Sequence, residues 1–328
     1  MKILKKELPD SFIKNKSYNM YFENRSMAVF DIETTGLSPT HSSLILSGII
    51  TVIDGKRTAY EILAETLYDE ENVILKTVEI LESCDFLLTF NGKHFDMPFL
   101  KSRASKYNIK TPDMYNLDLY LILNGCAEFK ANLPNLKQKT VETFLGLAPG
   151  RTDTITGKES IELFSHYLKT GDKDAEKKIL LHNYDDIRQL YRLLSVIKYI
   201  DFHKSMSKRG FPASDAVIEK MQFKGKSLFI RGKHSLNRDY ISFFSEEMPC
   251  SIYFNKIGSF EIEIPLSKEQ NIYYVDALKL LGEFGATIKK YPAYESGYLI
   301  LKQSNQVNHL EINAFVISLL KNVLQIIV

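Results

Sequence analysis

Two carboxylates two residues apart, Asp31 and Glu33, are the side chains of this chain that most directly indicate chemistry. They follow the short apolar run 27–30 and precede the turn-rich segment 34–39, so the pattern predicts that they lie at the end of a strand. Side chains two residues apart on a strand share a face. Two such carboxylates repel unless a cation or a proton joins them, and oxygen ligands suit hard ions such as Mg²⁺ or Mn²⁺. A solvated strand end followed by a turn is the simpler alternative.

A second acid, Asp96, follows another apolar run, residues 86–90. Asn91 and Gly92 form a turn signal, and the pattern after them predicts a helix that runs to about residue 106 and has Asp96 near its start. An aspartate near a helix N-terminus often only caps the helix, so capping is the alternative to a chemical role.

A third element lies within a long helical pattern over about residues 175–199, where apolar residues recur at helical spacing. His182 and Asp186 are four residues apart in this pattern and therefore lie on one face of the predicted helix. A surface pair, or a buried hydrogen-bonded pair, would explain them without catalysis. Three acidic elements in one chain together favour a shared site over three unrelated structural roles.

These motifs, in this order, resemble those of the DnaQ-like 3′–5′ exonucleases of the ribonuclease H-like superfamily, whose signature is four acids plus a Tyr or His. The most specific part of the likeness is DIETTGL at residues 31–37. The residues that match the signature are Asp31, Glu33, Asp96, His182 and Asp186. The resemblance spans about residues 28–197 and implies an α/β fold in which helices flank a mixed ribonuclease H-like sheet.

Within that superfamily the chain more closely resembles the YprB-type exonuclease-like domain. The segments that carry this resemblance are LPNLKQKTVE at 133–142, GKES at 157–160 and LHNYDDI at 181–187. It extends over about residues 28–197 and says nothing of the last third of the chain.

One spacing departs from the family pattern. The His subclass of these exonucleases usually places its base five residues before the last acid, whereas His182 precedes Asp186 by four, the spacing of the Tyr subclass. We therefore keep the general-base role of His182 separate from the metal-ligand roles of the acids. Tyr184 and Asp185, its neighbours, have no assigned role.

The resemblance implies phosphodiester hydrolysis with two divalent ions, Mg²⁺ or Mn²⁺. Two ions roughly 3.5–4 Å apart can stabilise both the attacking and the leaving oxygen. Asp31 would bridge the ions. Glu33 and Asp186 would favour the ion that carries the attacking water, and Asp96 would orient the second ion largely through water. His182 would accept the proton of that water, since a neutral imidazole can do so near pH 7.

Other residues near the motifs are candidates for substrate contact, namely Thr34, Leu37 and Asn91. Asp118 is a further acid, which we expect to stabilise a turn rather than to reach the site. The expected partner is nucleic acid with single-stranded 3′ ends. DNA and RNA both stay open, because no motif reports contacts to the 2′ hydroxyl.

The composition agrees with a cytoplasmic enzyme. The 328 residues are 45% hydrophobic and 25% charged, enough for two domains with their own cores. Three cysteines without a CxxC pattern argue against a disulfide framework and a zinc site, and fit a reducing compartment. The N-terminus lacks the apolar core of a signal peptide and no stretch has the length of a membrane span, so we expect no membrane association. The apolar run 314–324 predicts a packed helix.

The order of elements changes after about residue 202. We therefore expect an N-terminal extension (1–26), a ribonuclease H-like domain (27–202) and a smaller C-terminal β-rich α+β domain (203–328). The net charge is only +2, so phosphate contacts must be local.

Candidate phosphate contacts gather in the C-terminal third, where basic residues alternate with aromatic ones. They are Lys204, Lys208, Arg209, Lys224, Lys226, Arg231 and Lys233, with Phe223 and Phe229 interleaved. Bases can stack on such rings while cations follow the backbone. An ordinary strand with its polar residues outward is the preferred explanation.

The favoured function is a metal-dependent 3′–5′ exonuclease, because all four acids of the signature are present. Two alternatives stay open. One is a non-catalytic nucleic-acid-binding module that kept the fold, which the loss of an acid would have favoured. The other is a structure-specific endonuclease with the same metal site, which only product analysis separates from an exonuclease. The oligomeric state is open as well.

Overall fold

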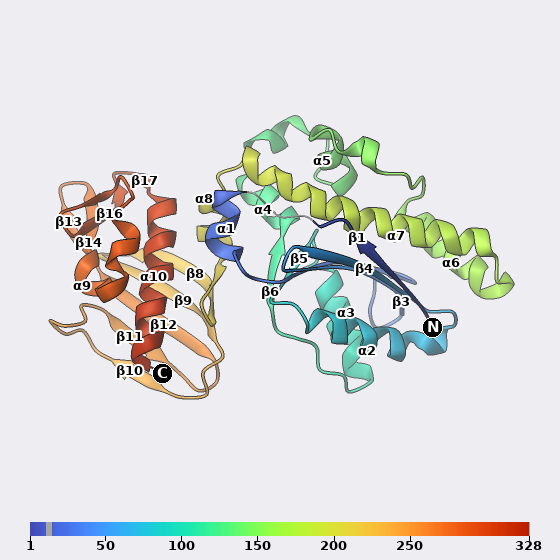
Figure 1. The fold of residues 1–328 in the computed structure, drawn as a ribbon, viewed down its shortest axis with the longest axis horizontal. Coiled ribbons are helices and arrows are strands. Elements are labelled where there is room, and N and C mark those ends of the chain that lie inside the picture. The colour runs from blue at the N-terminus through green and yellow to red at the C-terminus, as the bar shows by residue number, and fades with distance from the viewer. Residues whose placement is uncertain (11–14, 328) are drawn as a thin grey trace. The chain divides into compact units, whose positions relative to one another are not determined.

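The computed structural model describes residues 1–10 and 15–327, which form two compact units (Figure 1). Among these residues, unit 1 holds 1–10 and 24–200, and unit 2 holds 15–23 and 201–327. Residues 1–26, predicted as an N-terminal extension, therefore divide between the two units. Each unit is described by itself below.

A six-stranded mixed sheet with the strand order β1-β4-β3-β2-β5-β6 forms the centre of unit 1. Its strands are β1 (Lys2–Leu8), β2 (Met27–Thr34), β3 (Leu44–Ile53), β4 (Lys56–Leu63), β5 (Phe86–Thr89) and β6 (Tyr115–Asp118). Neighbours from β1 to β2 are antiparallel, and β2, β5 and β6 are parallel. The structure confirms the predicted mixed sheet: Asp31 and Glu33 lie near the end of β2, and Asp96 lies beyond β5 at the start of α3.

Helices cover both faces of this sheet, with α2 and α3 on one face and α6 and α7 on the other (Figure 1). Their bounds are α2 (Glu70–Leu81), α3 (Asp96–Lys106), α6 (Gly157–Thr170) and α7 (Lys173–Leu193). The shorter elements are α4 (Leu119–Cys126), α5 (Gln138–Phe144), and the 3₁₀ turns η1 (Leu67–Asp69), η2 (Glu128–Asn132), η3 (Ala148–Gly150) and η4 (Leu194–Tyr199). The arrangement confirms the ribonuclease H-like α/β class.

Local signals set the ends of α6 and α7. Thr156 and Glu159 form a reciprocal capping box at the start of α6, and Gly171 ends that helix with a φ of 69°. Such a positive φ favours glycine, which has no Cβ. Asp172 then caps α7 by accepting a hydrogen bond from the backbone N–H of Asp174. The long helix that carries His182 therefore begins at a defined residue.

A buried ion pair ties α2 and α3 to the sheet. Glu70 accepts hydrogen bonds from Nε and Nη2 of Arg103 at 2.7 and 2.5 Å, from the Tyr107 hydroxyl at 2.7 Å, and from the Leu44 backbone N–H at 2.7 Å. Burial alone would raise the pKa of Glu70, but these hydrogen bonds bring it below its usual range. The pair holds α3, which begins at Asp96, against the start of β3.

Unit 2 is built from two antiparallel sheets and four helices within the described residues. The first sheet has the order β10-β11-β12-β9-β8-β7, with β7 (Phe211–Ala213), β8 (Ala216–Lys224), β9 (Ser227–His234), β10 (Tyr240–Ser242), β11 (Ser251–Phe254) and β12 (Ser259–Pro265). The second contains β13 (Ser267–Glu269), β14 (Ile272–Asp276), β15 (Tyr294–Glu295), β16 (Tyr298–Gln303) and β17 (Gln306–Val307). The helices are α1 (Lys16–Phe22), α8 (Phe202–Arg209), α9 (Ala277–Leu281) and α10 (His309–Ile327), and η5 spans Gly282–Ile288. This confirms the predicted β-rich α+β class.

The short helix α1 belongs to unit 2 through buried polar contacts. The Tyr21 hydroxyl lies 2.7 Å from Nδ1 of His203 in α8 and accepts a hydrogen bond from Nδ2 of Asn313 in α10 at 2.7 Å. Phe22 beside it is buried. These contacts explain why residues 15–23 separate from the strand that precedes them in the sequence.

The helix α10 corrects one expectation. At 19 residues it is long and apolar enough to cross a membrane by length and composition, although no stretch of that length was expected. Within unit 2, however, 61% of its most apolar window is buried, and Phe315, Leu319 and Val323 are fully buried. The helix has the burial of a packed core helix, as the apolar run predicted.

We predict that Glu70→Ala lowers the free energy of unfolding by about 3–5 kcal/mol, because Arg103 would stay buried without its partner. Urea denaturation followed by circular dichroism measures the change. Glu71→Ala is the matched control, since Glu71 is the exposed neighbour on α2, and it should shift the value by less than about 0.5 kcal/mol. Equal losses in the two variants would contradict the role of the pair.

Candidate active site

Glu33, His182 and Asp186 meet where β2 faces α7. One ligand atom of each lies within 4.8 Å of the other two. Nε2 of His182 is 3.7 Å from a carboxylate oxygen of Glu33 and 3.5 Å from one of Asp186. Four residues make about one helical turn, so His182 and Asp186 present their side chains together. The structure thus gathers three of the predicted residues into a group that could hold a metal ion.

Asp31 and Asp96 lie beside this group. Oδ2 of Asp31 accepts a hydrogen bond from Nδ2 of Asn183 in α7 at 2.9 Å. Oδ1 of Asp96, the first residue of α3, accepts one from the backbone N–H of Ile32 at 3.2 Å. Asp96 therefore contacts β2 at Ile32, the residue between Asp31 and Glu33. All five predicted catalytic residues come from β2, α3 and α7.

Burial raises the pKa of all four acids, and the charge of neighbouring carboxylates raises it further. Burial, followed by the charges of Asp96, Asp186 and Glu33, raises the pKa of Asp31 well above its usual range. Burial and then the charge of Asp186 raise the pKa of Glu33 to about 8, and burial raises that of Asp96 to about 7. Burial also raises the pKa of Asp186. Arg151 pairs with only one of the four acids, Asp186, and the oxygen donors of the group fit a hard divalent cation.

Asp153, which no sequence motif indicated, orients His182. Its Oδ2 lies 2.7 Å from Nδ1 of His182 and 2.9 Å from Nζ of Lys139, and its Oδ1 accepts from Nη1 of Arg151 at 2.8 Å. Burial alone would raise the pKa of Asp153, but hydrogen bonds from Arg151, Lys139 and His182 lower it to about 2. The carboxylate is therefore an acceptor. In the neutral imidazole, Nδ1 carries the proton and Nε2 keeps its lone pair toward the acids.

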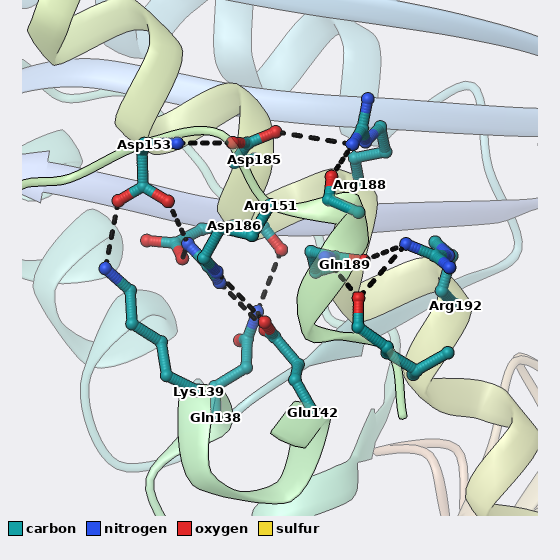
Figure 2. A network of polar contacts seen from close by, with 12 residues as sticks. Gln138, Lys139, Glu142, Arg151, Asp153, Asp185, Asp186, Arg188, Gln189 and Arg192 are labelled. Carbon is teal, nitrogen blue, oxygen red and sulfur yellow. Dashed lines mark hydrogen bonds and ion pairs between the residues drawn. The ribbon is translucent and has the colours of Figure 1, made fainter. Parts of the chain in front are cut away.

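Arg151 connects α5, its own loop and α7 (Figure 2). Its Nε and Nη2 donate to the two carboxylate oxygens of Glu142 at 2.9 and 2.8 Å. Its Nη1 lies 2.6 Å from Oδ1 of Asp186. This bidentate contact with Glu142 fixes the plane of the guanidinium group. Arg151 thus holds a positive charge against one of the predicted metal ligands.

Asp185 fixes the loop that carries Arg151 and Asp153. Its Oδ2 accepts hydrogen bonds from the backbone N–H groups of Thr152 and Asp153 at 2.5 and 2.8 Å, and from the Thr152 hydroxyl at 2.9 Å. Figure 2 shows Asp185 next to Asp153. The neighbouring Tyr184 instead packs its ring against Nζ of Lys6 in β1, 5.2 Å from the ring centroid. The structure therefore gives Asp185 a positioning contact and no place in the acidic group.

Asn183 depends on a glycine in β3. Gly48 lies opposite Asp31 in the strand register, and a Cβ on it would fall 1.9 Å from Oδ1 of Asn183. Only a residue without a side chain leaves room for this buried amide, which donates to Asp31. A glycine inside the apolar run 44–53 was the one sequence signal for this arrangement, because an interior strand glycine often marks a close approach.

The three candidates for substrate contact differ in how exposed their side chains are and in the hydrogen bonds they already make. Thr34 is buried and its hydroxyl donates to the Gly36 carbonyl at 2.8 Å, whereas the Leu37 side chain is 81% exposed. Asn91 has a φ of 66°, and its backbone N–H donates to Asp118 at 2.9 Å. Asp118 also accepts from the backbone N–H of Lys93 at 3.0 Å, which gives it the expected turn-stabilising role.

We predict that the metal-free protein loses stability as the pH rises from 5 to 9. Glu33 and Asp96 titrate near pH 8 and 7 when folded, against usual values of 4.5 and 3.8. The folded state then binds more protons than the unfolded state over this range, so stability falls as the pH rises. Melting in EDTA should drop by on the order of 5–10 °C, and Mn²⁺ should reverse the drop.

Glu33→Gln is the control for this pH dependence, because it removes one of the carboxylates whose pKa is raised. Its melting temperature in EDTA should depend less steeply on pH than that of the wild type. A wild-type melting temperature that rises with pH in EDTA would contradict the assignment.

Comparison with known proteins agrees with this geometry. A family model described as the RNase H superfamily matches residues 28–198. The uncharacterised protein YprB of Bacillus subtilis is 28% identical over 183 residues, which are 54% of this chain and 42% of YprB. The uncharacterised protein MJ0365 of Methanocaldococcus jannaschii is 29% identical over 182 residues, which are 52% of this chain and 94% of MJ0365.

A third similarity is to DNA polymerase 1 of Sulfurisphaera ohwakuensis, 25% identical over 185 residues. The match covers 50% of this chain and 20% of the polymerase. The chain thus spans less than half of YprB and a fifth of the polymerase, and nearly the whole of MJ0365. The family model covers more than half of the sequence and the predicted acids lie within it, so this chain belongs to the RNase H superfamily.

Proposed function

We propose that this protein is a metal-dependent nuclease that removes nucleotides from the 3′ ends of single-stranded or frayed nucleic acid. The observation that carries the proposal is the group of Glu33, His182 and Asp186, with Asp31 and Asp96 beside it. Membership of the RNase H superfamily and similarity to a DNA polymerase support nucleic acid as the substrate. The 3′ polarity rests on the resemblance of the acidic motifs to those of DnaQ-like exonucleases.

Asp31, Glu33, Asp96 and Asp186 would hold two divalent ions, Mg²⁺ or Mn²⁺. Their raised pKa values support this assignment, because a bound cation offsets the burial and the repulsion that disfavour the charged carboxylates. Such ions, when bound, supply positive charge to the attacking and leaving oxygens of a phosphodiester. Asn183 keeps the Asp31 carboxylate oriented by donating to Oδ2.

His182 would accept a proton from the attacking water at Nε2. The contact of Nδ1 with Asp153 supports this role, since it sets the tautomer in which Nε2 is the acceptor. An ionised Asp153 also stabilises the imidazolium that forms when the proton arrives. The spacing of four residues to Asp186 does not prevent this role, because Nε2 already lies 3.5 Å from that carboxylate.

We predict that a 5′-labelled single strand shortens stepwise from its 3′ end in Mg²⁺ or Mn²⁺ and stays intact in EDTA. Asp31→Asn should slow cleavage by about 10³-fold or more, because it removes the charge expected to bridge both ions. Asp54→Asn is the matched control, since Asp54 is exposed in the turn after β3. Parallel DNA and RNA substrates identify the sugar preference.

Two other results would replace the exonuclease assignment. Cleavage of a circular single strand, which has no 3′ end, would identify an endonuclease with the same site. Retained binding without cleavage of any substrate, in either metal, would identify a non-catalytic module.

We predict that Asp153→Asn lowers kcat by about 10²-fold, within the range for loss of general-base assistance. Mn²⁺ affinity by calorimetry should change only a few-fold, because Asp153 lies outside the acidic group. The double variant with His182→Ala should be no slower than His182→Ala alone, since Asp153 acts through the imidazole. Multiplicative losses in the double variant would show that Asp153 acts by another route.

A further inference from the structure

The sheet of β7–β12 in unit 2 has one buried face and one open face. Leu228, Ile230 and Ile262 point to the buried face and are at most 1% exposed. Because side chains alternate along a strand, the residues between them point to the opposite face. There, five side chains of β8 and β9 line a single hollow: Lys220, Gln222, Lys224, Phe229 and Arg231.

Phe229 is the central side chain of this hollow. The register places it between Gln222 of β8 and Glu263 of β12, and it is only partly buried. A second ring, Tyr253 of β11, lies on the same face one strand beyond β12 and is 47% exposed. An aromatic ring on an open face among polar residues is not needed to close the core, and it offers a flat apolar surface to a ligand.

The positive charges of the hollow lie on the β8 side. Arg231 pairs with Glu261 of β12, whereas Lys220 and Lys224 make no ion pair within residues 1–10 and 15–327. This part of β8 is an edge of its sheet, because β7 pairs only with residues 216–218. Edge lysines also discourage pairing with other chains, so the lysines alone do not indicate a ligand. The feature that indicates a ligand is the ring of Phe229, which lies between the cations.

We propose that this hollow, here called the β8–β9 face, binds single-stranded nucleic acid. One base stacks on Phe229 while Lys220, Lys224 and Arg231 contact the phosphates beside it. Aromatic rings on sheet surfaces bind single strands in this way, with cations along the backbone. A duplex does not fit, because its bases are already stacked and paired. The choice of ligand rests on the proposed nuclease function.

The neighbouring residues set the limits of this site. Gln222, opposite Phe229, carries both donors and acceptors that suit a base edge. Glu261 and Glu263 on β12 repel phosphates, so the strand follows β8 and β9 instead of crossing the whole sheet. A strand held here stays tethered to unit 1 through the polypeptide, which raises its effective concentration there. Long substrates should therefore bind more tightly than short ones.

Fluorescence anisotropy with the full chain in EDTA tests the site. The probes are 5′-labelled oligo(dT) and oligo(U) of about 20 nucleotides, longer than such surfaces usually cover. Phe229→Ala should weaken binding about tenfold or more, in line with the loss of one stacked base. Phe229→Tyr keeps the ring and should bind like the wild type. The two probes show whether the site accepts DNA, RNA or both.

Charge reversal gives a second, independent readout. Lys220→Glu with Lys224→Glu should weaken binding and reduce the slope of log K against log salt by about 1.4, or 0.7 for each lost phosphate contact. The matched control is Lys279→Glu with Lys289→Glu, two exposed lysines of unit 2 outside this sheet. Thermal melting verifies that the variants are folded. Unchanged affinity in folded Phe229→Ala and in the charge-reversal variant would overturn the proposal.

The design separates this site from the nuclease itself. Binding in EDTA needs no turnover. A wild type that cleaves nothing but binds through Phe229 would therefore contradict the proposed nuclease function and support the β8–β9 face as a binding site. If the wild type cleaves a short oligonucleotide while Phe229→Ala and the charge-reversal variant bind normally, the nuclease function is supported and the β8–β9 face is not a binding site.

Discussion

Repulsion among four buried or half-buried carboxylates is the constraint on which unit 1 depends. Asp31, Glu33, Asp96 and Asp186 all have raised pKa values because burial and neighbouring carboxylates disfavour the charged forms. The four carboxylates stay close together despite this repulsion because the sheet and the helices on both its faces hold them in place. Such an arrangement lowers the stability of the metal-free chain, and groups perturbed in this way gather at functional sites.

The residues around the acids limit that repulsion and orient the group. On α7, two adjacent aspartates have different tasks: Asp185 holds the loop of residues 151–153, and Asp186 faces Arg151 of that loop at 2.6 Å. Asp153 from the same loop reaches His182. The buried carboxylate of Asp185 therefore positions both Arg151 and Asp153, the partner of His182. A change in this loop would affect the whole site.

Local patterns predicted the residues that share an element, whereas residues that meet only through tertiary packing escaped prediction. The alternation on β2 placed Asp31 and Glu33 on one face, and helical spacing joined His182 to Asp186. Asp153 lies in an irregular loop 29 residues before His182, where no periodicity applies. In unit 2, strand alternation indicated the basic and aromatic pattern, but the register was needed to show that Phe229 lies among the cations. The allocation of α1 to unit 2 likewise depends on distant partners.

Anomalous diffraction from crystals grown with Mn²⁺ tests the metal site most directly. We expect two peaks roughly 3.5–4 Å apart, contacted by Asp31, Glu33, Asp96 and Asp186, with Nε2 of His182 facing the pair. Asp31→Asn crystals, in which the residue expected to bridge both ions is changed, should lose at least one peak. Wild-type crystals without a peak among these four acids at millimolar Mn²⁺ would contradict a two-metal site.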